Sequence, residues 1–342
     1  MPPPGTENPW QQGCPPHEIR LWRFSLPLRQ ALSMPGHTLT RREGLLLEWC
    51  RPRADSLWSE ISPLPGFSRA TLARCHQQVR QILDQDGPLA DRLLHLPTGT
   101  APEVCFGLEA GRLQWRGQLP AAAPVPLCRL IRHDDALDIA ADTASPCFKL
   151  KVGRDDLTTD IDRIRQVTAR LTEGQWLRLD ANRSWTLEQA EALCGAIDRR
   201  RIQFIEEPLP AGSDYLSWWS RTGIPFAWDE TLRETTAPDL RTPGLGALVV
   251  KPMLTGLNRA DRLVQQARRQ GISVVLSASY ESNLTLDFHA RLVHYWNLQG
   301  PQGLDTFGIF ARALLTPILS QPEQAGLPIT QQSELEYLGC WT

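Results

Sequence analysis

The 342-residue sequence predicts an α/β protein in which an α+β domain is followed by a parallel barrel of the TIM type. Three observations support this prediction. Beyond about residue 119, short apolar segments alternate with amphipathic segments, at a period typical of βα units. Seven or eight such units follow one another, which favours a closed barrel over an open sheet. Charged residues recur where successive apolar segments end.

Composition excludes several classes of protein. A hydrophobic content of 42% is enough for a packed core, and a formal net charge of −2 does not indicate binding to nucleic acid. We find no apolar run suited to membrane insertion and no signal peptide at the start of the sequence. The eight cysteines form no C-x-x-C pair, so we expect free thiols and a cytoplasmic protein. The sequence does not indicate an oligomeric state.

The sequence predicts a tail at the start of the chain and an α+β segment after it. Residues 1–18 are rich in proline, glycine and glutamine, and we expect a loose tail there. Alternating patterns predict strands at residues 19–28 and 44–50, and helical spacing predicts helices at 71–83 and 102–109. Prolines and a glycine mark a shaped loop over residues 59–67.

A linker rich in proline and alanine, residues 119–126, precedes the predicted barrel. We expect its strands at residues 125–130, 148–152, 176–179, 203–205, 226–228, 247–250 and 273–276. We expect helices between them at residues 158–171, 187–199, 215–222 and 259–270.

Two lysines in the strand at residues 148–152 point to the same face. Lys149 and Lys151 are two positions apart, so both side chains lie on the same face of the strand and both ammonium groups enter the same surroundings. Crowding of like charges and burial both disfavour protonation, and a lysine with a lowered pKa can act as a base near neutral pH. A strand with a solvated lysine face is the alternative interpretation of this pattern alone.

Four charged residues follow four successive predicted strands. They are Asp180, Glu206, Asp229 and Lys251, separated by 26, 23 and 22 residues. Each step is one βα unit, so these residues occupy the same place on neighbouring strands. That place is the carboxyl-end rim, where barrel enzymes carry their active sites.

Three neighbouring carboxylates would repel one another unless they shared a cation. A hard divalent ion such as Mg²⁺ suits oxygen ligands of this kind. Charged lysines cannot be ligands, and their presence beside the metal suggests removal of a proton next to a carboxylate, with the metal stabilising the resulting dianion. A single acidic residue of this kind could instead be a helix N-cap or a surface ion-pair partner.

The motifs K-x-K, D-A-N, E-E-P, W-D-E and V-K-P, in this order, resemble the enolase superfamily in its muconate-lactonising branch. Within that branch, the longer matching segments are similar to the o-succinylbenzoate synthase family; they are residues 60–67, 148–153, 177–185, 227–234 and 303–306. The similarity runs from about residue 19 to the end of the chain.

This resemblance implies an enolase-like (β/α)7β barrel with an α+β capping domain. The cap would comprise residues 19–118 and the barrel residues 119–313, with residues 314–342 returning to the cap. The family implies Asp180, Glu206 and Asp229 as ligands of Mg²⁺, with Mn²⁺ as an alternative metal. It implies Lys151 as the general base, Lys251 across the substrate and Lys149 as the residue that tunes Lys151.

The implied reaction is the syn-dehydration of 2-succinyl-6-hydroxy-2,4-cyclohexadiene-1-carboxylate to o-succinylbenzoate in menaquinone biosynthesis. The substrate is thus a small carboxylate, and the expected substrate-binding residues are Arg178, Asn182, Ser277, Ser279 and Gly303. Loops near residues 33–42 and 59–67 would touch its succinyl arm. Glu207 and Glu230, which directly follow two expected ligands, should face away and have a structural role.

Two other enzymatic hypotheses remain open. An N-acylamino acid racemase or dipeptide epimerase of the same superfamily would use Lys151 and Lys251 as bases on opposite faces. A metal-free Schiff-base lyase would use one of these lysines as a nucleophile, but it would leave the three carboxylates without a role. A purely binding role does not explain a costly cluster of three carboxylates and three lysines.

Overall fold

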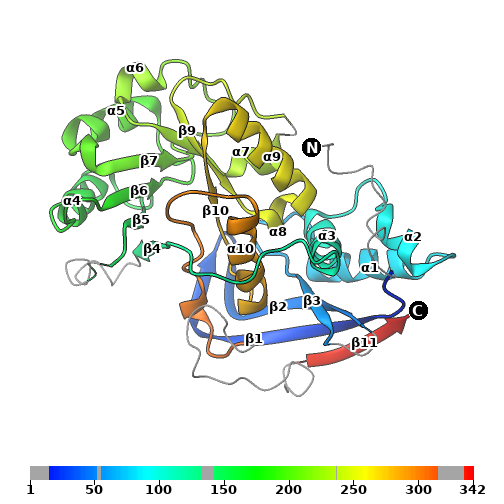
Figure 1. Ribbon diagram of the computed structural model, residues 1–342. Helices are drawn as coiled ribbons and strands as arrows, with labels where there is room; N and C mark the ends of the chain where they lie inside the picture. Colours follow the sequence, from blue (N-terminus) through cyan, green and yellow to red (C-terminus); the bar gives the residue numbers. More distant parts are fainter. Residues whose placement is uncertain (1–14, 52–54, 132–141, 143, 236, 315–334) are drawn as a thin grey trace.

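The structure is a computed structural model that describes residues 15–51, 55–131, 142, 144–235, 237–314 and 335–342. Most of the expected N-terminal tail, residues 1–14, lies outside the described residues, as do residues 315–334 of the expected C-terminal segment. The chain forms two sheets, an antiparallel one with the N-terminal helices beside it and a parallel one surrounded by the later helices (Figure 1).

The antiparallel sheet has the strand order β11-β1-β2-β3. Strands β1 (Ile19–Met34) and β2 (His37–Trp49) form a long hairpin, and β3 (Leu57–Ile61) pairs with β2. Strand β11 (Leu335–Trp341) pairs antiparallel with β1. The end of the chain therefore lies in the same sheet as its first strand, some 300 residues earlier.

Three helices pack on this sheet: α1 (Leu72–Leu83), α2 (Leu89–Leu94) and α3 (Pro102–Trp115). The helix α1 begins where predicted, because the Thr71 hydroxyl accepts a hydrogen bond from the backbone N–H of Arg74. The helix α3 is longer than predicted and lies very close to the sheet. A Cβ atom added at Gly111 would lie 2.0 Å from the Trp49 ring, so this approach requires glycine.

The parallel sheet has the order β10-β9-β8-β7-β6-β5-β4, so every strand neighbours the next along the chain. Its strands are β4 (Cys128–Ile131), β5 (Cys147–Lys151), β6 (Trp176–Asp180), β7 (Ile202–Glu206), β8 (Phe226–Trp228), β9 (Leu245–Val250) and β10 (Ser273–Leu276). All seven lie at the predicted positions to within three residues at each end.

A short segment closes the barrel between its two edge strands. Gln302 pairs with Leu127 beside β4, and Gly303 pairs with Ser277 beside β10. The N–H of Cys128 donates to the carbonyl of Gln302 at 2.8 Å, and the N–H of Gly303 donates to the carbonyl of Leu276 at 2.9 Å. This segment supplies the eighth strand position, and the predicted (β/α)7β arrangement is confirmed.

The barrel helices are α4 (Leu157–Thr168), α5 (Leu187–Ala196), α6 (Trp218–Thr222), α7 (Glu230–Glu234), α8 (Pro252–Thr255), α9 (Leu257–Gln270) and α10 (Asn283–Tyr295). The sequence patterns predict α4, α5, α6 and α9. They do not predict the short helices α7 and α8, which directly follow the strand-end residues Asp229 and Lys251, nor the long α10.

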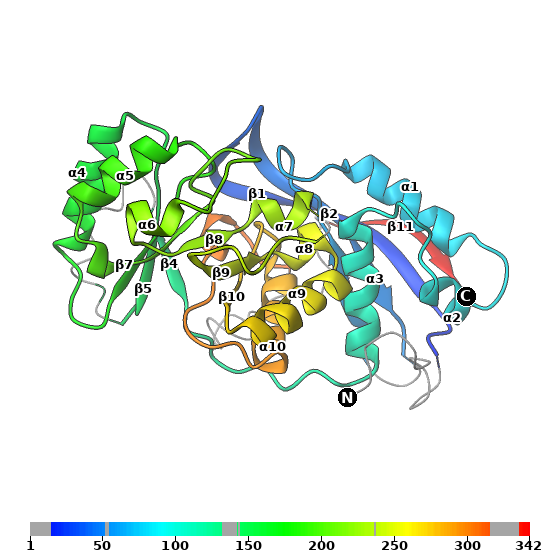
Figure 2. The same ribbon diagram turned by 90° about the horizontal axis from the view of Figure 1, so that it is seen from above.

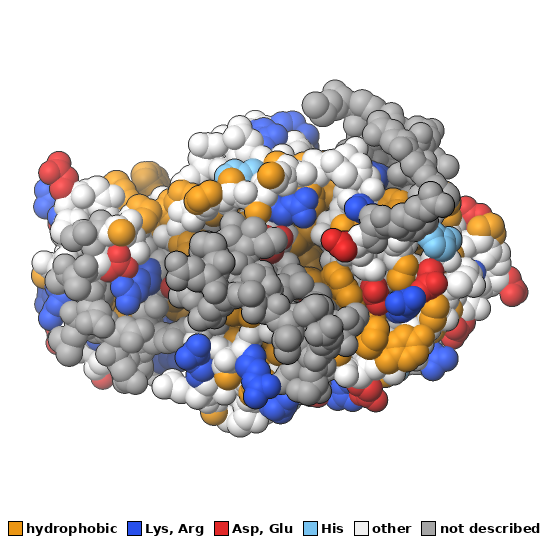
Figure 3. Space-filling view, turned by 60° about the horizontal axis from the view of Figure 1, so that its bottom comes forward, with side chains coloured by type: hydrophobic (Ala, Val, Ile, Leu, Met, Phe, Trp, Pro, Cys, Tyr) orange, Lys and Arg blue, Asp and Glu red, His pale blue; other side chains and the backbone are white. Residues whose placement is uncertain are grey.

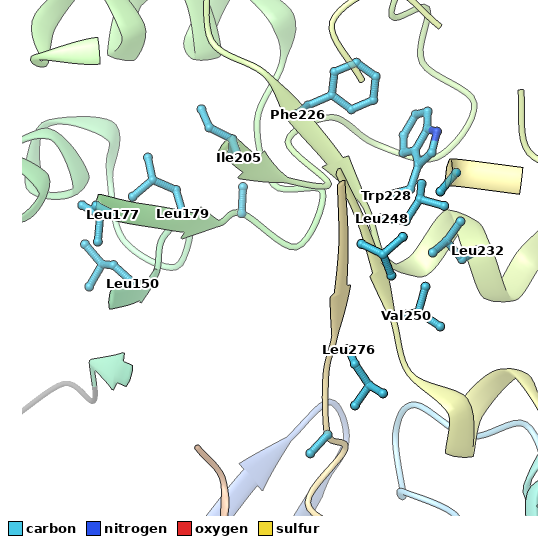
Figure 4. Close-up of a cluster of buried hydrophobic side chains, with 14 of the residues drawn as sticks. Leu150, Leu177, Leu179, Ile205, Phe226, Trp228, Leu232, Leu248, Val250 and Leu276 are labelled. Carbon is cyan, nitrogen blue, oxygen red and sulfur yellow. The ribbon is translucent and has the colours of Figure 1, made fainter. Parts of the chain in front are cut away.

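Apolar side chains between the barrel strands and the helices form the largest buried cluster of the described chain. Figure 4 shows part of it, with side chains from strands β5 to β10 and Leu232 from α7. In the described part of the chain, no helix has the length and hydropathy needed to span a membrane. Lysine, arginine and acidic side chains are interspersed on the face shown in Figure 3, in keeping with the near-neutral net charge.

The cap is joined to the barrel through α3, which packs on β3 on one side and on α8 and α9 on the other (Figure 2). The buried Glu109 carboxylate of α3 accepts hydrogen bonds from Asn258 in the first turn of α9, at 2.9 Å from the backbone nitrogen and 2.7 Å from Nδ2. These contacts hold the cap loops near the carboxyl ends of the barrel strands.

Candidate active site

The parallel register brings the predicted site residues together. Lys151 on β5 is level with Asp180 on β6, and Asp180 is level with Glu206 on β7. These positions line one pocket together with Lys149 and Lys251. The strand-end argument from the sequence therefore places these five charged residues around a common cavity.

Every substrate-binding residue expected from the sequence also lines this pocket, and the set comprises Arg178, Asn182, Ser277, Ser279 and Gly303. Among the predicted site residues only Asp229 lies behind the pocket wall, with 2% of its surface exposed. Its carboxylate is in contact with the ammonium group of Lys251.

The three lysines have different surroundings. The Nζ atom of Lys149 lies 2.6 Å from Glu206 Oε2 and 3.0 Å from Asp180 Oδ2. Lys251 donates to Asp229 Oδ2. Lys151 forms only a longer ion pair, 4.0 Å from Asp180 Oδ2, and its side chain is 28% exposed. Of the three ammonium groups, that of Lys151 is the least tied to a carboxylate.

The expected lowering of the Lys149 pKa is wrong. Burial disfavours its charged form, but the carboxylates of Asp180 and Glu206 outweigh burial, and the pKa of Lys149 is raised well above its usual value. The pKa of Lys251 is raised in the same way, because Asp229 outweighs burial. Neighbouring strands supply these carboxylates, so the K-x-K pattern considered alone predicts the wrong direction for the pKa shift of Lys149.

The carboxylates respond to the same charges. Burial favours the neutral form of Asp180, but Lys149 and Lys151 outweigh it and hold its pKa below the usual value. Lys251 holds the pKa of Asp229 below its usual value against the effect of burial. For Glu206, burial prevails and the pKa is raised. The surroundings of Asp180 and Asp229 thus favour their ionised forms.

The donor set fits a hard divalent cation. Among the described residues, the buried Oδ1 atoms of Asp180 and Asp229 accept no hydrogen bond, and that of Asp229 lies 3.8 Å from Arg233 Nε in an ion pair. Among the residues described, however, no three acidic, histidine or cysteine side chains converge closely enough to hold a metal. The Lys149 ammonium contacts both Asp180 and Glu206, which places positive charge between these two carboxylates.

Two further glutamates support the site. Glu207 accepts hydrogen bonds from the backbone nitrogens of Asp229 and Thr231 at 2.9 and 2.7 Å, and it pairs with Arg183 at 3.1 Å. Glu230 accepts from Asn182 Nδ2 at 3.2 Å, and burial raises the pKa of Glu230 to about 7. The contacts of Glu207 are those of the structural role expected from its place in the sequence.

The expected substrate-binding residues also have protein partners. Arg178 donates to Gln203 Oε1 at 2.7 Å, and its guanidinium lies 5.0 Å from the centre of the Phe204 ring. The N–H and the hydroxyl of Ser279 both donate to the carboxylate of Glu281, each at 2.6 Å. The hydroxyl proton of Ser279 is therefore engaged by Glu281, which leaves the hydroxyl oxygen as an acceptor.

The sequence interpretation did not single out several residues of this pocket. Leu64, Phe67 and Met34 come from the cap loops that were expected to contact the substrate, but they were not named individually. Tyr280 and Asp305 also line the cavity. Asp305 lies in the G-L-D-T segment, whose similarity to the family is the one signal that could have indicated it.

Comparison with known proteins assigns this fold and site to a class. The sequence profile described as "Enolase C-terminal domain-like" matches residues 133–301. The solved dipeptide epimerase of Enterococcus faecalis superposes with a TM-score of 0.74 over 94% of this chain and 96% of that one, at 17% identity, which shows the shared fold. The class of protein defined here is the enolase superfamily.

Closer relatives identify the family within this class. The profile described as "MenC, N-terminal domain" matches residues 17–115. The o-succinylbenzoate synthase of Klebsiella pneumoniae is 32% identical over 93% of this chain and 98% of its own length, and that of Haemophilus influenzae is 33% identical over 87% and 92%. The chain belongs to the o-succinylbenzoate synthase family.

A solved member of this family supports the assignment. The o-succinylbenzoate synthase of Thermosynechococcus elongatus, described as complexed with Mg in its active site, superposes with a TM-score of 0.71 at 26% identity. The superposition covers 87% of this chain and 96% of that one.

Proposed function

We propose that the chain catalyses the Mg²⁺-dependent syn-dehydration of 2-succinyl-6-hydroxy-2,4-cyclohexadiene-1-carboxylate to o-succinylbenzoate, a carbon–oxygen lyase reaction of menaquinone biosynthesis. The names of its relatives support the reaction. The observation that carries the mechanism is the difference among the lysines. Lys149 and Lys251 are held by carboxylates, whereas Lys151 reaches the cavity with only a 4.0 Å ion pair.

Lys151 is the proposed general base. It removes the proton on the carbon next to the substrate carboxylate, and the negative charge spreads onto the carboxylate oxygens. The protonated Lys151 then donates this proton to the departing hydroxyl group, so water leaves and the ring becomes aromatic. One group serves both steps on one face of the ring, which explains the syn stereochemistry.

The other two lysines have electrostatic roles in this proposal. Lys251 follows β9 and lines the cavity, and its charge stabilises the dianion formed when the proton leaves. Lys149 stays protonated between Asp180 and Glu206, where its raised pKa makes it unsuited to act as a base. Its positive charge favours the ionised forms of Asp180 and Glu206.

Asp180, Glu206 and Asp229 are the residues proposed to hold Mg²⁺, with Mn²⁺ as an alternative. A bound divalent ion supplies positive charge that stabilises the substrate carboxylate as it becomes doubly charged. The Oδ1 atoms of Asp180 and Asp229, which accept no hydrogen bond among the described residues, support this assignment. Accommodating the ion requires the ammonium groups of Lys149 and Lys251 to move away from these carboxylates, and the length of the lysine side chain allows this.

The remaining pocket residues orient the substrate and exclude water. The cap contributes the apolar side chains of Leu64, Phe67 and Met34, which suit the methylene carbons of a succinyl group. The barrel contributes Ser277 and Gly303 to the same pocket. We also propose that the enzyme acts in the cytoplasm, since all seven cysteines among the described residues are free thiols.

The proposed reaction is tested with the substrate itself. The cyclohexadiene carboxylate is supplied with Mg²⁺, and the loss of its ultraviolet absorbance is followed with and without EDTA. We expect rapid loss that EDTA abolishes. Absence of turnover with Mg²⁺ present would reject the dehydratase. Exchange of the α-proton of an N-acylamino acid or dipeptide for deuterium would then indicate the racemase or epimerase that uses Lys151 and Lys251 as two bases.

A further inference from the structure

A buried arginine of the cap joins two loops that line the pocket. Arg42 lies on β2, and only 2% of its surface is exposed. Its guanidinium donates to the carbonyl of Ser62 at 2.8 Å, to that of Pro63 at 2.8 Å and to that of Tyr280 at 3.0 Å. The first two belong to the cap loop after β3, and the third belongs to the barrel loop after β10. One side chain thus fixes the spacing between the two loops.

Both of these loops contribute walls of the pocket. Leu64 and Phe67 come from the cap loop, and Ser277, Ser279 and Tyr280 come from the barrel loop. Tyr280 has a φ angle of +59°, in the left-handed region that is unfavourable for a residue with a side chain. The hydrogen bond from Arg42 to its carbonyl therefore stabilises a strained conformation in the wall of the site.

Two buried carboxylates complete the cluster. Glu60 of β3 accepts hydrogen bonds from the hydroxyls of Ser282 at 2.6 Å and Thr285 at 2.7 Å, which hold the start of α10. Glu281 accepts both hydrogen bonds from Ser279. Both glutamates are fully buried. Of the charged groups around the Arg42 guanidinium, these two glutamates oppose most strongly the effect of burial on its charged form. Burial also raises the pKa of Glu281 above its usual value.

We propose that Arg42 is a positioning residue that sets the geometry of the substrate-binding wall at residues 277–280, through a buried cluster formed with Glu60 and Glu281. The inference rests on the proposed function for its kinetic consequence. Arg42 contacts no reacting group, and Lys151 and the carboxylates lie on other strands. Its loss should therefore weaken substrate binding far more than it slows the chemical step.

The test compares two arginine-to-lysine variants of the full chain. Arg42→Lys keeps the charge but loses the planar fork that donates to four backbone carbonyls, those of Ser62, Pro63 and Tyr280 and that of the adjacent Glu43. The matched control is Arg112→Lys in α3, where the guanidinium also donates to backbone carbonyls, those of Leu93 and Leu94, but within the cap and away from the pocket. For each variant, kcat and KM are measured with Mg²⁺, and amide hydrogen exchange is measured for residues 277–285.

We expect Arg42→Lys to raise KM about tenfold or more with kcat within about threefold of the wild type, and to speed exchange over residues 277–285. Arg112→Lys should leave KM within about twofold and exchange there unchanged. An unchanged KM or unchanged exchange in Arg42→Lys, or equal changes in both variants, would overturn the inference. Hydrogen exchange needs no substrate, so it tests the role of Arg42 even if the wild type is inactive. An inactive wild type would reject only the proposed function.

A second variant covers the case in which Arg42→Lys does not fold. Glu281→Gln removes one of the two carboxyl groups that act on Arg42 and weakens the hold on Ser279, with almost no change in side-chain volume. It should also raise KM and speed exchange over residues 277–282. A folded Glu281→Gln variant with wild-type KM and exchange would contradict the proposed role of the cluster.

Discussion

Residues of one chemical type differ in this pocket because of what surrounds them. Lys149, Lys151 and Lys251 all line the cavity. Carboxylates from neighbouring strands hold the first and the last, and their pKa values are raised. Lys151 lies 4.0 Å from Asp180 and is partly exposed. The proposed division of work, with one base and two fixed cations, follows from these contacts.

Replacement of Asp229 by asparagine tests the metal site at the scale of a single residue. We expect Asp229→Asn to lower the affinity for Mg²⁺ on the order of 100-fold or more, because a charged oxygen ligand becomes a neutral amide. Calorimetric titration with Mg²⁺ measures the change. Asp162→Asn, on an exposed part of α4, is the matched control and should bind as the wild type does. Normal affinity in Asp229→Asn would contradict the ligand assignment.

At the scale of the element, the turn after β5 tests how the strand ends are held. Gly153 has a φ angle of +75°, and a Cβ atom there would lie 1.6 Å from the hydroxyl of Ser184. Gly153→Ala should cost about 1–3 kcal/mol of unfolding free energy and lower kcat/KM, because Ser184 belongs to the loop that carries Asn182. Denaturant unfolding and the substrate assay measure both effects.

Gly174→Ala is the matched control for this prediction. Gly174 has a similar φ angle of +81°, but an added Cβ would meet no atom within 4 Å. It should show only the cost of the left-handed backbone, about 1 kcal/mol, with full activity. Equal stability and activity in the two variants would show that the close approach to Ser184 has no influence on the site.

The helix α10 carries a buried histidine that should make stability depend on pH. Both ring nitrogens of His289 lack a hydrogen-bond partner among the residues that the structure describes. Burial lowers the pKa of His289 to about 3 from a usual 6.5, against a smaller opposing effect of Glu60. The unfolded chain then binds more protons than the folded one between these values, so stability falls as pH falls below 6.5. From pH 7 to pH 5, this residue should remove about 2 kcal/mol.

His289→Phe tests this contribution, since the ring of His289 packs against those of Phe106 and Phe288. The variant should be at least as stable as the wild type at pH 7 and should lose about 2 kcal/mol less between pH 7 and pH 5, measured by denaturant unfolding. His294→Phe, with its largely exposed ring on the same helix, should keep the wild-type pH dependence. The same acid sensitivity in His289→Phe would show that other groups cause it.

The strands of the barrel could be predicted because apolar segments repeat at a regular spacing and end on charged residues. The gathering of Lys151, Asp180 and Glu206 could be predicted for the same reason, since the parallel register places these residues level with one another. The direction of the pKa shifts of Lys149 and Lys251 could not be predicted from the sequence, because it depends on carboxylates from other strands. Nor could the role of Arg42, whose carbonyl partners are set by the packing of cap on barrel.

At the scale of the whole molecule, the pocket needs both domains. The barrel supplies the charged residues, and the cap supplies Met34, Leu64 and Phe67. The helix α3, the Glu109–Asn258 hydrogen bonds and the Arg42 cluster hold the two parts together. In the proposed mechanism, the barrel therefore carries the residues for proton transfer, and the cap contributes to substrate selection.

The most direct test of the account compares the wild type with Lys151→Ala, both with saturating Mg²⁺ and the cyclohexadiene carboxylate. Loss of a general acid–base group lowers turnover about 10²–10⁴-fold. One residue serves both steps here, so we expect Lys151→Ala to lower turnover by about 10⁴-fold or more. Its affinity for Mg²⁺ and its fold should stay near those of the wild type. A folded Lys151→Ala variant that keeps more than about a few per cent of wild-type turnover would contradict the assignment of Lys151 as the base.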